Sequence, residues 1–254
     1  MTLSALLLEI RRIAEAAGRE TLRFYDGPAA AVEKADGSPV TAADEAAERL
    51  ILPALRALTP EIPIVSEEEA AAGLAPETVG DRFWLVDPLD GTKEFIKRNG
   101  EFTVNIALVE FGVPVLGVVH VPVTGETYAA SGPGTATLSV GGGESRPIAA
   151  RPLPAGGVTI VASRSHGDDT ALDQFLAGTK VAERRPAGSS VKFCLVARGA
   201  ADLYPRLGPT MEWDTAAGHA VLLGAGGAVT TIEGEPLHYG KPGYKNPHFV
   251  ASGV

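Results

Sequence analysis

The sequence predicts a mixed α and β fold, and three patterns lead to this prediction. Apolar residues recur at helical spacing near the N-terminus, whereas residues 102–130 contain apolar runs typical of β-strands. Gly and Pro gather in residues 131–154, between these strands and a second set of helix and strand patterns. With 254 residues, of which 45% are hydrophobic, the chain is long enough to bury a full core in one large domain or two smaller ones.

The first half of the chain is expected to contain two helices followed by paired strands. A helix is predicted from Leu3, and Gly27-Pro28 ends it. A second helix begins near Thr41. Residues 103–109 and 115–121 are separated by a short break, so we expect them to form antiparallel strands joined by a turn.

The stretch 131–154 indicates a junction between two domains because it is rich in Gly and Pro. We place the boundary at residue 150. Residues 1–150 are then an α and β domain with most of the candidate metal ligands, and residues 151–254 are a smaller α/β domain. In the second domain we predict a strand at 158–162 and helices at 169–176, 189–197 and 216–225.

Composition argues against several classes of protein. The formal net charge of −9 is unsuited to a nucleic-acid binder that neutralises many phosphates. The single cysteine, Cys194, excludes a disulfide framework, indicates a reducing compartment and is expected in the core. No apolar stretch approaches the length of a transmembrane segment, and the N-terminus is a charged amphipathic helix rather than a signal peptide. We therefore expect a cytoplasmic protein, with peripheral association with the inner membrane left open.

One short run carries most of the chemical information. A predicted buried strand, residues 84–86, leads directly into Asp87 and Asp90, which stand on either side of a Pro-Leu pair. The proline fixes its own φ at about −65° and pushes the residue before it towards an extended conformation, so the chain turns sharply while both acids stay close. Hard oxygen donors of this kind suit Mg²⁺, and the N–H groups that follow suit a phosphate oxygen. The expected metal donors are Asp87, Asp90 and the Leu89 carbonyl, and the expected phosphate contacts are Gly91 and Thr92.

The same run is also ordinary turn chemistry, since Pro, Asp and Gly all favour turns. Two further acids favour the metal interpretation. Glu67 follows a second β-rich run, and Asp214 precedes a helix of small residues. Each has an ordinary explanation when taken alone, a solvated helix start for Glu67 and a helix N-cap for Asp214. Three such acidic positions in one chain favour a cluster that binds two metal ions.

These motifs resemble the inositol monophosphatase superfamily and, within it, the bacterial 3'(2'),5'-bisphosphate nucleotidases. The resemblance implies a layered α-β-α-β-α sandwich with the metal site in the cleft between two domains. Sequence patterning alone predicts only a mixture of α and β. The superfamily motifs are residues 66–68, 84–92 and 213–218, and the nucleotidase motifs are residues 91–108, 163–166, 188–197 and 203–206.

The resemblance also implies a ligand set for two or three Mg²⁺ ions. Glu67, Asp87 and the Leu89 carbonyl would hold one ion, and Asp87, Asp90 and Asp214 would hold a second. Glu67 would also help to hold a third ion through water. Two ions about 3.5–4 Å apart stabilise the attacking and leaving oxygens of an in-line displacement. The nucleophile implied is a metal-activated water, with no covalent enzyme intermediate.

Catalytic roles are implied for Asp44, Thr92 and Glu67. Thr92 would accept or relay the proton of the attacking water, and Asp44 would pair with Thr92. Residues 41–44 also fit a helix capping box, and the two interpretations are compatible because a cap fixes a side chain in space. Lys34 fits either a position near the site or a solvated loop.

Four residues of the second half lie in motifs similar to those that contact the nucleotide in bisphosphate nucleotidases: His166, Ser189, Lys192 and Arg206. A serine at a helix start suits a phosphate, and a lysine three residues later lies on the same helical face. Arginine offers a fork of donors, and histidine offers a hydrogen bond to the nucleotide. Taken alone, Ser189 would be a helix cap, and Lys192 and Arg206 would be surface cations.

The resemblance thus implies a Mg²⁺-dependent phosphomonoesterase that removes the 3'-phosphate of adenosine 3',5'-bisphosphate, giving AMP and phosphate. It further implies lithium sensitivity, a role in sulfate assimilation and 3'-phosphoadenosine 5'-phosphosulfate as a further substrate. One alternative is an inositol or sugar-phosphate phosphatase on the same fold, and another is a non-catalytic nucleotide-binding protein. The sequence leaves open the preferred substrate, the resting metal count and the choice between monomer and homodimer.

Overall fold

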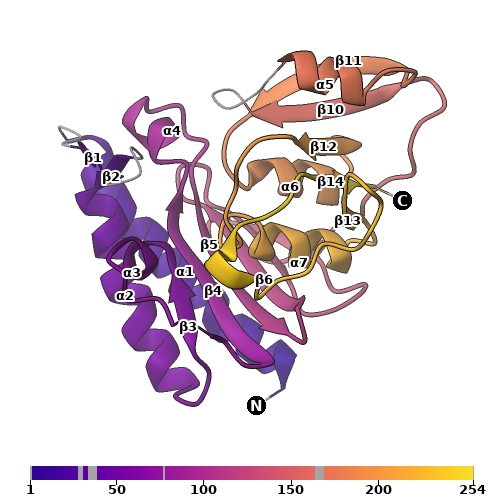
Figure 1. Ribbon diagram of the computed structural model, residues 1–254. Coiled ribbons are helices and arrows are strands. Elements are labelled where there is room, and N and C mark those ends of the chain that lie inside the picture. Colours follow the sequence, from indigo (N-terminus) through magenta and orange to yellow (C-terminus); the bar gives the residue numbers. More distant parts are fainter. Residues whose placement is uncertain (1, 28–30, 34–38, 77, 164–168, 254) are drawn as a thin grey trace.

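The computed structural model describes residues 2–27, 31–33, 39–76, 78–163 and 169–253 and arranges them in alternating layers of helices and strands (Figure 1). On one outer face, helices α1 (Leu3–Tyr25) and α2 (Ala42–Leu58) pack against a seven-stranded sheet. A middle layer of α6 (Val191–Ala197) and α7 (Ala216–Gly224) lies between that sheet and a five-stranded sheet. Helix α5 (Asp169–Phe175) covers the far face of the second sheet. The expected α-β-α-β-α sandwich is therefore confirmed.

Both sheets are mixed. In the first, β3 and β4 are parallel and the other neighbouring strands are antiparallel, in the order β3-β4-β5-β6-β7-β8-β9. The second has the order β11-β10-β12-β14-β13. The strands of the first sheet are β3 (Ile64–Ser66), β4 (Arg82–Asp90), β5 (Thr103–Glu110), β6 (Val113–Val121), β7 (Glu126–Ala130), β8 (Thr137–Val140) and β9 (Arg146–Pro147). Those of the second are β10 (Val158–Ser163), β11 (Val181–Ala187), β12 (Leu203–Arg206), β13 (Ala228–Thr231) and β14 (Phe249–Ser252).

The remaining elements are short. Strands β1 (Ala31–Glu33) and β2 (Pro39–Thr41) form a two-stranded antiparallel sheet before α2. Helix α3 (Glu67–Ala71) follows β3, α4 (Thr92–Ile96) follows β4, and a 3₁₀ turn, η1 (Pro242–Tyr244), precedes β14. Thus α3 and α4 each begin directly after a strand of the first sheet, where the predicted acids lie.

Helix α1 packs on the first sheet through a stripe of small and apolar residues. Leu6, Ile10 and Ala14 are buried at helical spacing, as the sequence predicts. One turn further on, Gly18 lies directly beneath the ring of His120, and a Cβ there would be 2.4 Å from His120 Cδ2. The absence of a side chain at position 18 therefore lets α1 lie close to β6.

The second half of the chain differs from the prediction in detail. Helix α6 begins at Val191 rather than at Ser189, because Ser189 has a positive φ of 43° and does not fit a helix. The stretch 131–154 contains strands β8 and β9 of the first sheet. The strands of the two sheets come from separate parts of the chain, but one buried core is shared between them, so the division at residue 150 stays a prediction.

The middle layer packs closely on the first sheet because small residues face one another. Gly117 of β6 lies against α7, and a Cβ on it would be 2.5 Å from Ala217 O and 2.6 Å from Ala220 Cβ. Gly218 lies in the same way against the ring of Phe193 on α6. Cys194 is a fully buried free thiol in this layer, as predicted. None of the helices in the described part of the chain combines the length and the apolar character that crossing a membrane requires.

We predict that Gly117→Ala destabilises the fold. The added methyl meets the backbone of α7, and overpacking of this kind costs about 1–3 kcal/mol, which for a chain of this size lowers Tm by about 2–4 °C per kcal/mol. Gly156→Ala is the matched control, since no atom lies within 4 Å of its added Cβ. Thermal and urea denaturation of both variants check the expectation. Equal stability of the two variants would show that α7 moves away from the sheet without cost.

Candidate active site

Strand β4 turns Asp87 and Asp90 to the same side of the sheet through a bulge. Asp87 pairs with Asn105 of β5 and Asp90 pairs with Thr103, so three steps along β4 match two steps along β5. Residues three apart in a regular strand point to opposite faces, but one extra residue restores the same face. Pro88 lies in this bulge, where an imide without an N–H is tolerated.

The face in question is the one that meets the middle layer. Along β4, Phe83 and Leu85 belong to the core shared with α6 and α7, whereas Trp84 belongs to the core beneath α1 and α2. Asp87 continues the first series, so it is directed towards the middle layer and the second sheet. The first sheet thus presents its acids to the second half of the chain.

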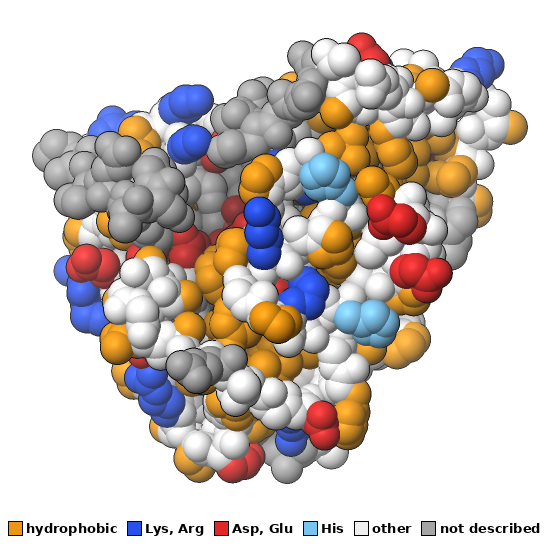
Figure 2. Space-filling model, in the orientation of Figure 1, with side chains coloured by type: hydrophobic (Ala, Val, Ile, Leu, Met, Phe, Trp, Pro, Cys, Tyr) orange, Lys and Arg blue, Asp and Glu red, His pale blue; other side chains and the backbone are white. Residues whose placement is uncertain are grey.

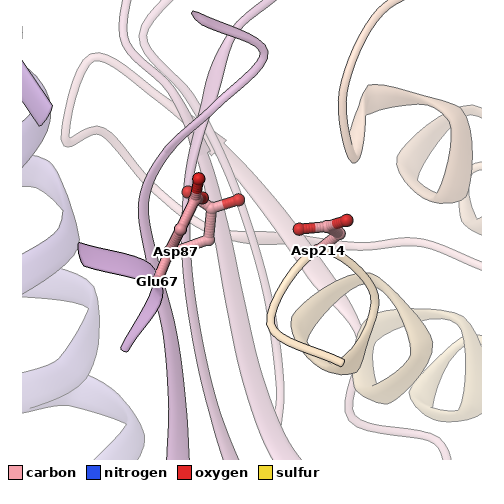
Figure 3. A group of neighbouring side chains, drawn as sticks. All are labelled: Glu67, Asp87 and Asp214. Carbon is pink, nitrogen blue, oxygen red and sulfur yellow. The ribbon is translucent and has the colours of Figure 1, made fainter. Parts of the chain in front are cut away.

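Glu67 and Asp214 complete an acidic cluster with Asp87. Strand β3 runs parallel to β4 with Ser66 opposite Val86, so Glu67 lies beside Asp87 at the next position. Asp214 comes from the loop before α7 and faces both of them (Figure 3). One carboxylate oxygen from each of the three residues lies within 4.8 Å of the others. We refer to Glu67, Asp87 and Asp214 as the acidic cluster.

The electrostatics of the cluster favour a bound cation. Burial, and after it the charges of Glu67, Asp90 and Asp214, raise the pKa of Asp87 well above its usual range. Burial, followed by the charge of Asp90, likewise raises the pKa of Asp214. These anions repel one another, and a divalent cation would offset the repulsion. Carboxylate oxygens are also the donors that hard cations prefer, so the residues present fit a metal site.

Asp90 lies beside the cluster and is held by donors from both halves of the chain. Its Oδ2 accepts hydrogen bonds from the Ser190 backbone N–H at 2.6 Å and from Asn105 Nδ2 at 3.2 Å. Burial raises its pKa, although the charge of Lys192 opposes the change. The N–H of Leu89 donates to Asp87 Oδ1 at 3.0 Å, which fixes the turn, and the Leu89 carbonyl stays a predicted ligand.

The structure brings Asp44 and Thr92 together. Thr92 Oγ1 donates to Asp44 Oδ1 at 3.2 Å. The other carboxylate oxygen of Asp44 accepts from Thr41 N at 2.8 Å, and the Thr41 side chain accepts from the backbone N–H of Asp44, which together form the predicted capping box. Thr41 Oγ1 also donates to the same carboxylate oxygen at 2.6 Å. The cap thus holds Asp44 in the position from which it reaches Thr92.

The predicted residues that the structure describes share one cleft, with a single exception. The cleft has a volume of about 890 Å³, and acidic side chains lie in a hollow on the face drawn in Figure 2. Asp44 is not in its wall and reaches it through Thr92. His166 and Lys34 lie outside the described residues. The predicted residues that line the cleft are Glu67, Asp87, Leu89, Asp90, Gly91, Thr92, Ser189, Lys192, Arg206 and Asp214.

The predicted nucleotide contacts have definite partners inside the protein. Lys192 is buried, and its Nζ donates to Ser189 O at 2.6 Å and to Ala187 O at 3.4 Å. Burial lowers its pKa to about 8. Arg206 Nη2 donates to Pro209 O at 2.6 Å, whereas Arg206 Nε has no hydrogen-bond partner among the described residues. Arg206 Nε is itself buried, so the guanidinium lines the cleft through its other atoms.

Sequence reasoning missed three residues that support the site. Glu48 accepts hydrogen bonds from Ser66 Oγ and from the Glu69 N–H, and so caps the helix that begins at Glu67. It stands four residues after Asp44, on the same face of α2, and this spacing was a usable signal. The other two are Asn105, a lone amide in an apolar strand, and Ser190, next to the predicted Ser189.

Comparisons with known proteins agree with this geometry. The model of the inositol monophosphatase family matches residues 5–251. The 3'(2'),5'-bisphosphate nucleotidase CysQ of Escherichia coli O6:H1 is 48% identical over 250 residues, which cover 97% of this chain and 99% of that protein.

Solved structures show the same likeness. The crystal structure of CysQ from Bacteroides thetaiotaomicron, a bacterial member of the inositol monophosphatase family, has a TM-score of 0.81 and 40% identity over 98% of this chain and 97% of that one. The inositol monophosphatase of Anabaena has a TM-score of 0.75 and 27% identity over 98% of this chain and 90% of that one.

We predict that Asp87→Asn has opposite effects with and without metal. In buffer that contains a metal chelator, the variant is expected to unfold at a higher temperature than the wild type. The neutral amide removes the repulsion between position 87 and the neighbouring carboxylates, and it keeps an acceptor for the Leu89 N–H. With Mg²⁺ at about 100 times its Kd, the wild type should gain about 2.7 kcal/mol, and the variant should gain much less. Thermal denaturation in both buffers measures this. An equal gain in the two proteins would remove Asp87 from the ligand set.

Proposed function

The chain belongs to the inositol monophosphatase family, and from this premise we propose that it is a metal-dependent phosphomonoesterase that converts adenosine 3',5'-bisphosphate to AMP and phosphate. The observation that carries the proposal is the shared cleft, in which the acidic cluster faces Lys192 and Arg206. Carboxylates suit a metal that engages the scissile phosphate, and cations suit a second phosphate on the same molecule. The near full-length similarity to CysQ nucleotidases supports this choice of substrate.

The acidic cluster would hold the metal, with Asp90 and the Leu89 carbonyl as further ligands. We propose Mg²⁺ as the ion, with two or three ions in each site. When bound, the ions supply a water activated as nucleophile and neutralise charge on the phosphate and the leaving oxygen. Glu67 reaches the site from the first turn of α3. Glu48 accepts a hydrogen bond from the Glu69 N–H of that turn, which holds the start of the helix, and Glu67 with it, against α2.

Thr92 and Asp44 act on the proton of the attacking water. Because Thr92 Oγ1 donates its hydrogen to Asp44 Oδ1, its lone pairs are directed elsewhere and can accept a hydrogen bond from the water. A proton that moves to Thr92 is balanced by the hydroxyl proton that it passes to Asp44. The N–H groups of Gly91 and Thr92, at the start of α4, would hold an oxygen of the scissile phosphate.

The second half of the chain would select the nucleotide. Arg206 lines the cleft, and its guanidinium offers a fork of donors to the 5'-phosphate or the base. Lys192 contributes positive charge from behind the backbone of residues 187–189, and the Ser189 hydroxyl lies at the cleft. His166 is proposed as a further nucleotide contact on its motif alone.

Several finer points belong to the same proposal. From the resemblance to bisphosphate nucleotidases we expect three further properties. The protein should hydrolyse 3'-phosphoadenosine 5'-phosphosulfate, should be inhibited by lithium and should take part in sulfate assimilation. We also propose a cytoplasmic protein, either a monomer or a homodimer, with the metal ligands up to Asp90 in a domain of residues 1–150 and Asp214 in a domain of residues 151–254. An inositol phosphatase is the second candidate, because the Anabaena enzyme shares the fold at 27% identity.

The direct test is phosphate release with Mg²⁺ from adenosine 3',5'-bisphosphate and from inositol 1-phosphate, side by side, with and without lithium. We expect a preference for the nucleotide of several orders of magnitude and suppression by lithium. Preference for the inositol ester would keep the metal ligands and overturn the nucleotide contacts. No release from either substrate would favour the non-catalytic nucleotide-binding protein.

We predict that Arg206→Ala lowers kcat/KM for adenosine 3',5'-bisphosphate by about 10–100-fold, since a hydrogen bond to a charged group contributes about 1.5–3 kcal/mol. Adenosine 3'-phosphate, which lacks the 5'-phosphate, is the control substrate, and its kcat/KM should change far less. Steady-state kinetics on both substrates separate the effects. An equal loss on the two substrates would place Arg206 at the scissile phosphate or in the fold instead.

A further inference from the structure

Ser190 joins the two halves of the site through three hydrogen bonds. Its backbone N–H donates to Asp90 Oδ2 at 2.6 Å, and its Oγ donates to the main-chain carbonyl of Asp214 at 2.7 Å. The same Oγ accepts from Asn105 Nδ2 at 3.0 Å. Ser190 is 1% exposed, so these contacts are shielded from bulk solvent. The residue therefore touches the first sheet and the loop before α7 at the same time.

The orientation of Asn105 is fixed by this arrangement. Both hydrogens of its Nδ2 are used, one towards Asp90 Oδ2 at 3.2 Å and one towards Ser190 Oγ. Its Oδ1 is buried and has no hydrogen-bond partner among the described residues. The opposite amide orientation would place that oxygen against the Asp90 carboxylate, so an unsatisfied acceptor is the smaller cost. Buried polar atoms without a partner are uncommon, and here the two hydrogen bonds donated by Nδ2 account for one.

Ser190 contacts the main chain of Asp214, so it does not occupy the carboxylate that would bind the metal. Ser190 binds the main-chain carbonyl of Asp214, whereas the Met211 N–H holds Asp214 Oδ2 at 2.8 Å. The backbone of Asp214 is thus fixed relative to Asp90 without the use of a further carboxylate oxygen. This matters because Asp90 and Asp214 are both negatively charged and would otherwise move apart.

The loop before α6 is held in place on its other side as well. Gly188 N donates to Glu101 Oε2 at 2.8 Å, and a Cβ at position 188 would lie 2.6 Å from Glu94 Cγ. Ser189 then takes a positive φ of 43°, a strained conformation for a residue with a side chain. A strained turn fixed at both ends places Ser190 at one position relative to β4.

We propose that Ser190, oriented by Asn105, is a positioning residue that sets the separation between Asp90 and Asp214 so that both bind the same metal ion. The proposal rests on the metal site of the proposed function. It assigns to Ser190 and Asn105 no contact with substrate. Their effect on turnover passes entirely through the geometry of the two aspartates.

Binding of Mn²⁺ to the metal-free protein, followed by electron paramagnetic resonance, tests the proposal without substrate. Ser190→Ala removes both side-chain hydrogen bonds and keeps the N–H bond to Asp90. We expect it to raise the Kd for Mn²⁺ by about 10–100-fold, the usual effect of losing a residue that orients a metal ligand. Ser139→Ala is the matched control, because it removes a buried hydroxyl bonded to Arg11 Nη2 far from the cluster and should leave the Kd unchanged.

A second variant keeps the test decisive if Ser190→Ala folds poorly. Asn105→Leu keeps the number and branching of the side-chain heavy atoms and removes the unsatisfied Oδ1, so we expect it to fold, yet it should raise the Kd for Mn²⁺ in the same range. The two single variants share the loss of the Asn105–Ser190 hydrogen bond, and Asn105→Leu also loses the direct bond to Asp90, so the loss in the double variant should be smaller than the product of the two single losses. Wild-type Mn²⁺ affinity in folded Ser190→Ala or Asn105→Leu would overturn the proposal, and so would losses that multiply fully in the double variant.

Turnover separates this proposal from the proposed function. If the wild type binds Mn²⁺ but releases no phosphate from adenosine 3',5'-bisphosphate, the proposed function fails while the affinity series still decides the role of Ser190. If the wild type binds no Mn²⁺, the metal site itself is refuted and the positioning role with it. The expected kinetic result for Ser190→Ala is a lower kcat at subsaturating Mg²⁺ that excess Mg²⁺ largely restores.

Discussion

Mutual repulsion among carboxylates is the constraint on which the site depends. Glu67, Asp87, Asp90 and Asp214 are held together in a cleft where burial makes the charges of the three aspartates more costly. Hydrophobic packing alone does not hold like charges at this distance, so each acid has its own restraint. The Leu89 N–H holds Asp87, a bulge turns Asp90, a capped helix carries Glu67, and the Ser190 hydroxyl fixes the backbone of Asp214. The restraints come from both sheets, which ties the fold to the chemistry.

The middle layer makes these restraints rigid. Helix α7 lies against β6 at a distance that only glycine at position 117 permits, and α6 lies against α7 through Gly218. Close-packed interiors resist small displacements, so the packed helices α6 and α7 hold the loops at their ends in fixed positions. Lys192, at the start of α6, is held by backbone carbonyls rather than left to the solvent. Its charge therefore stays near Asp90, where it offsets part of the repulsion.

Local features of the site could be predicted from the sequence, and contacts between distant segments could not. Asp87 and Asp90 could be predicted as neighbouring acids, because the effects of proline and of strand patterning extend over only a few residues. Asp44 was placed by its capping box, which is equally local. The link between Asn105 and Ser190 joins residues 85 positions apart, and neither residue type is distinctive by itself. The late start of α6 depends on the strained φ of Ser189, which only the surrounding contacts at Gly188 and Asp90 explain.

Because of the bulge in β4, the number of residues between Asp87 and Asp90 decides which face of the sheet the second aspartate occupies. Deleting one residue between Asp87 and Asp90 would remove the bulge and leave the two aspartates two residues apart in a regular strand, still on the same face. Inserting one residue while the bulge is kept would instead turn the second aspartate to the face where Trp84 and Val86 meet α1 and α2. Substitutions within the Pro-Leu pair leave this alternation unchanged, whereas a single inserted residue moves a charge from an open cleft into a closed apolar core. The segment is therefore open to replacement of its residues but closed to the insertion of one residue.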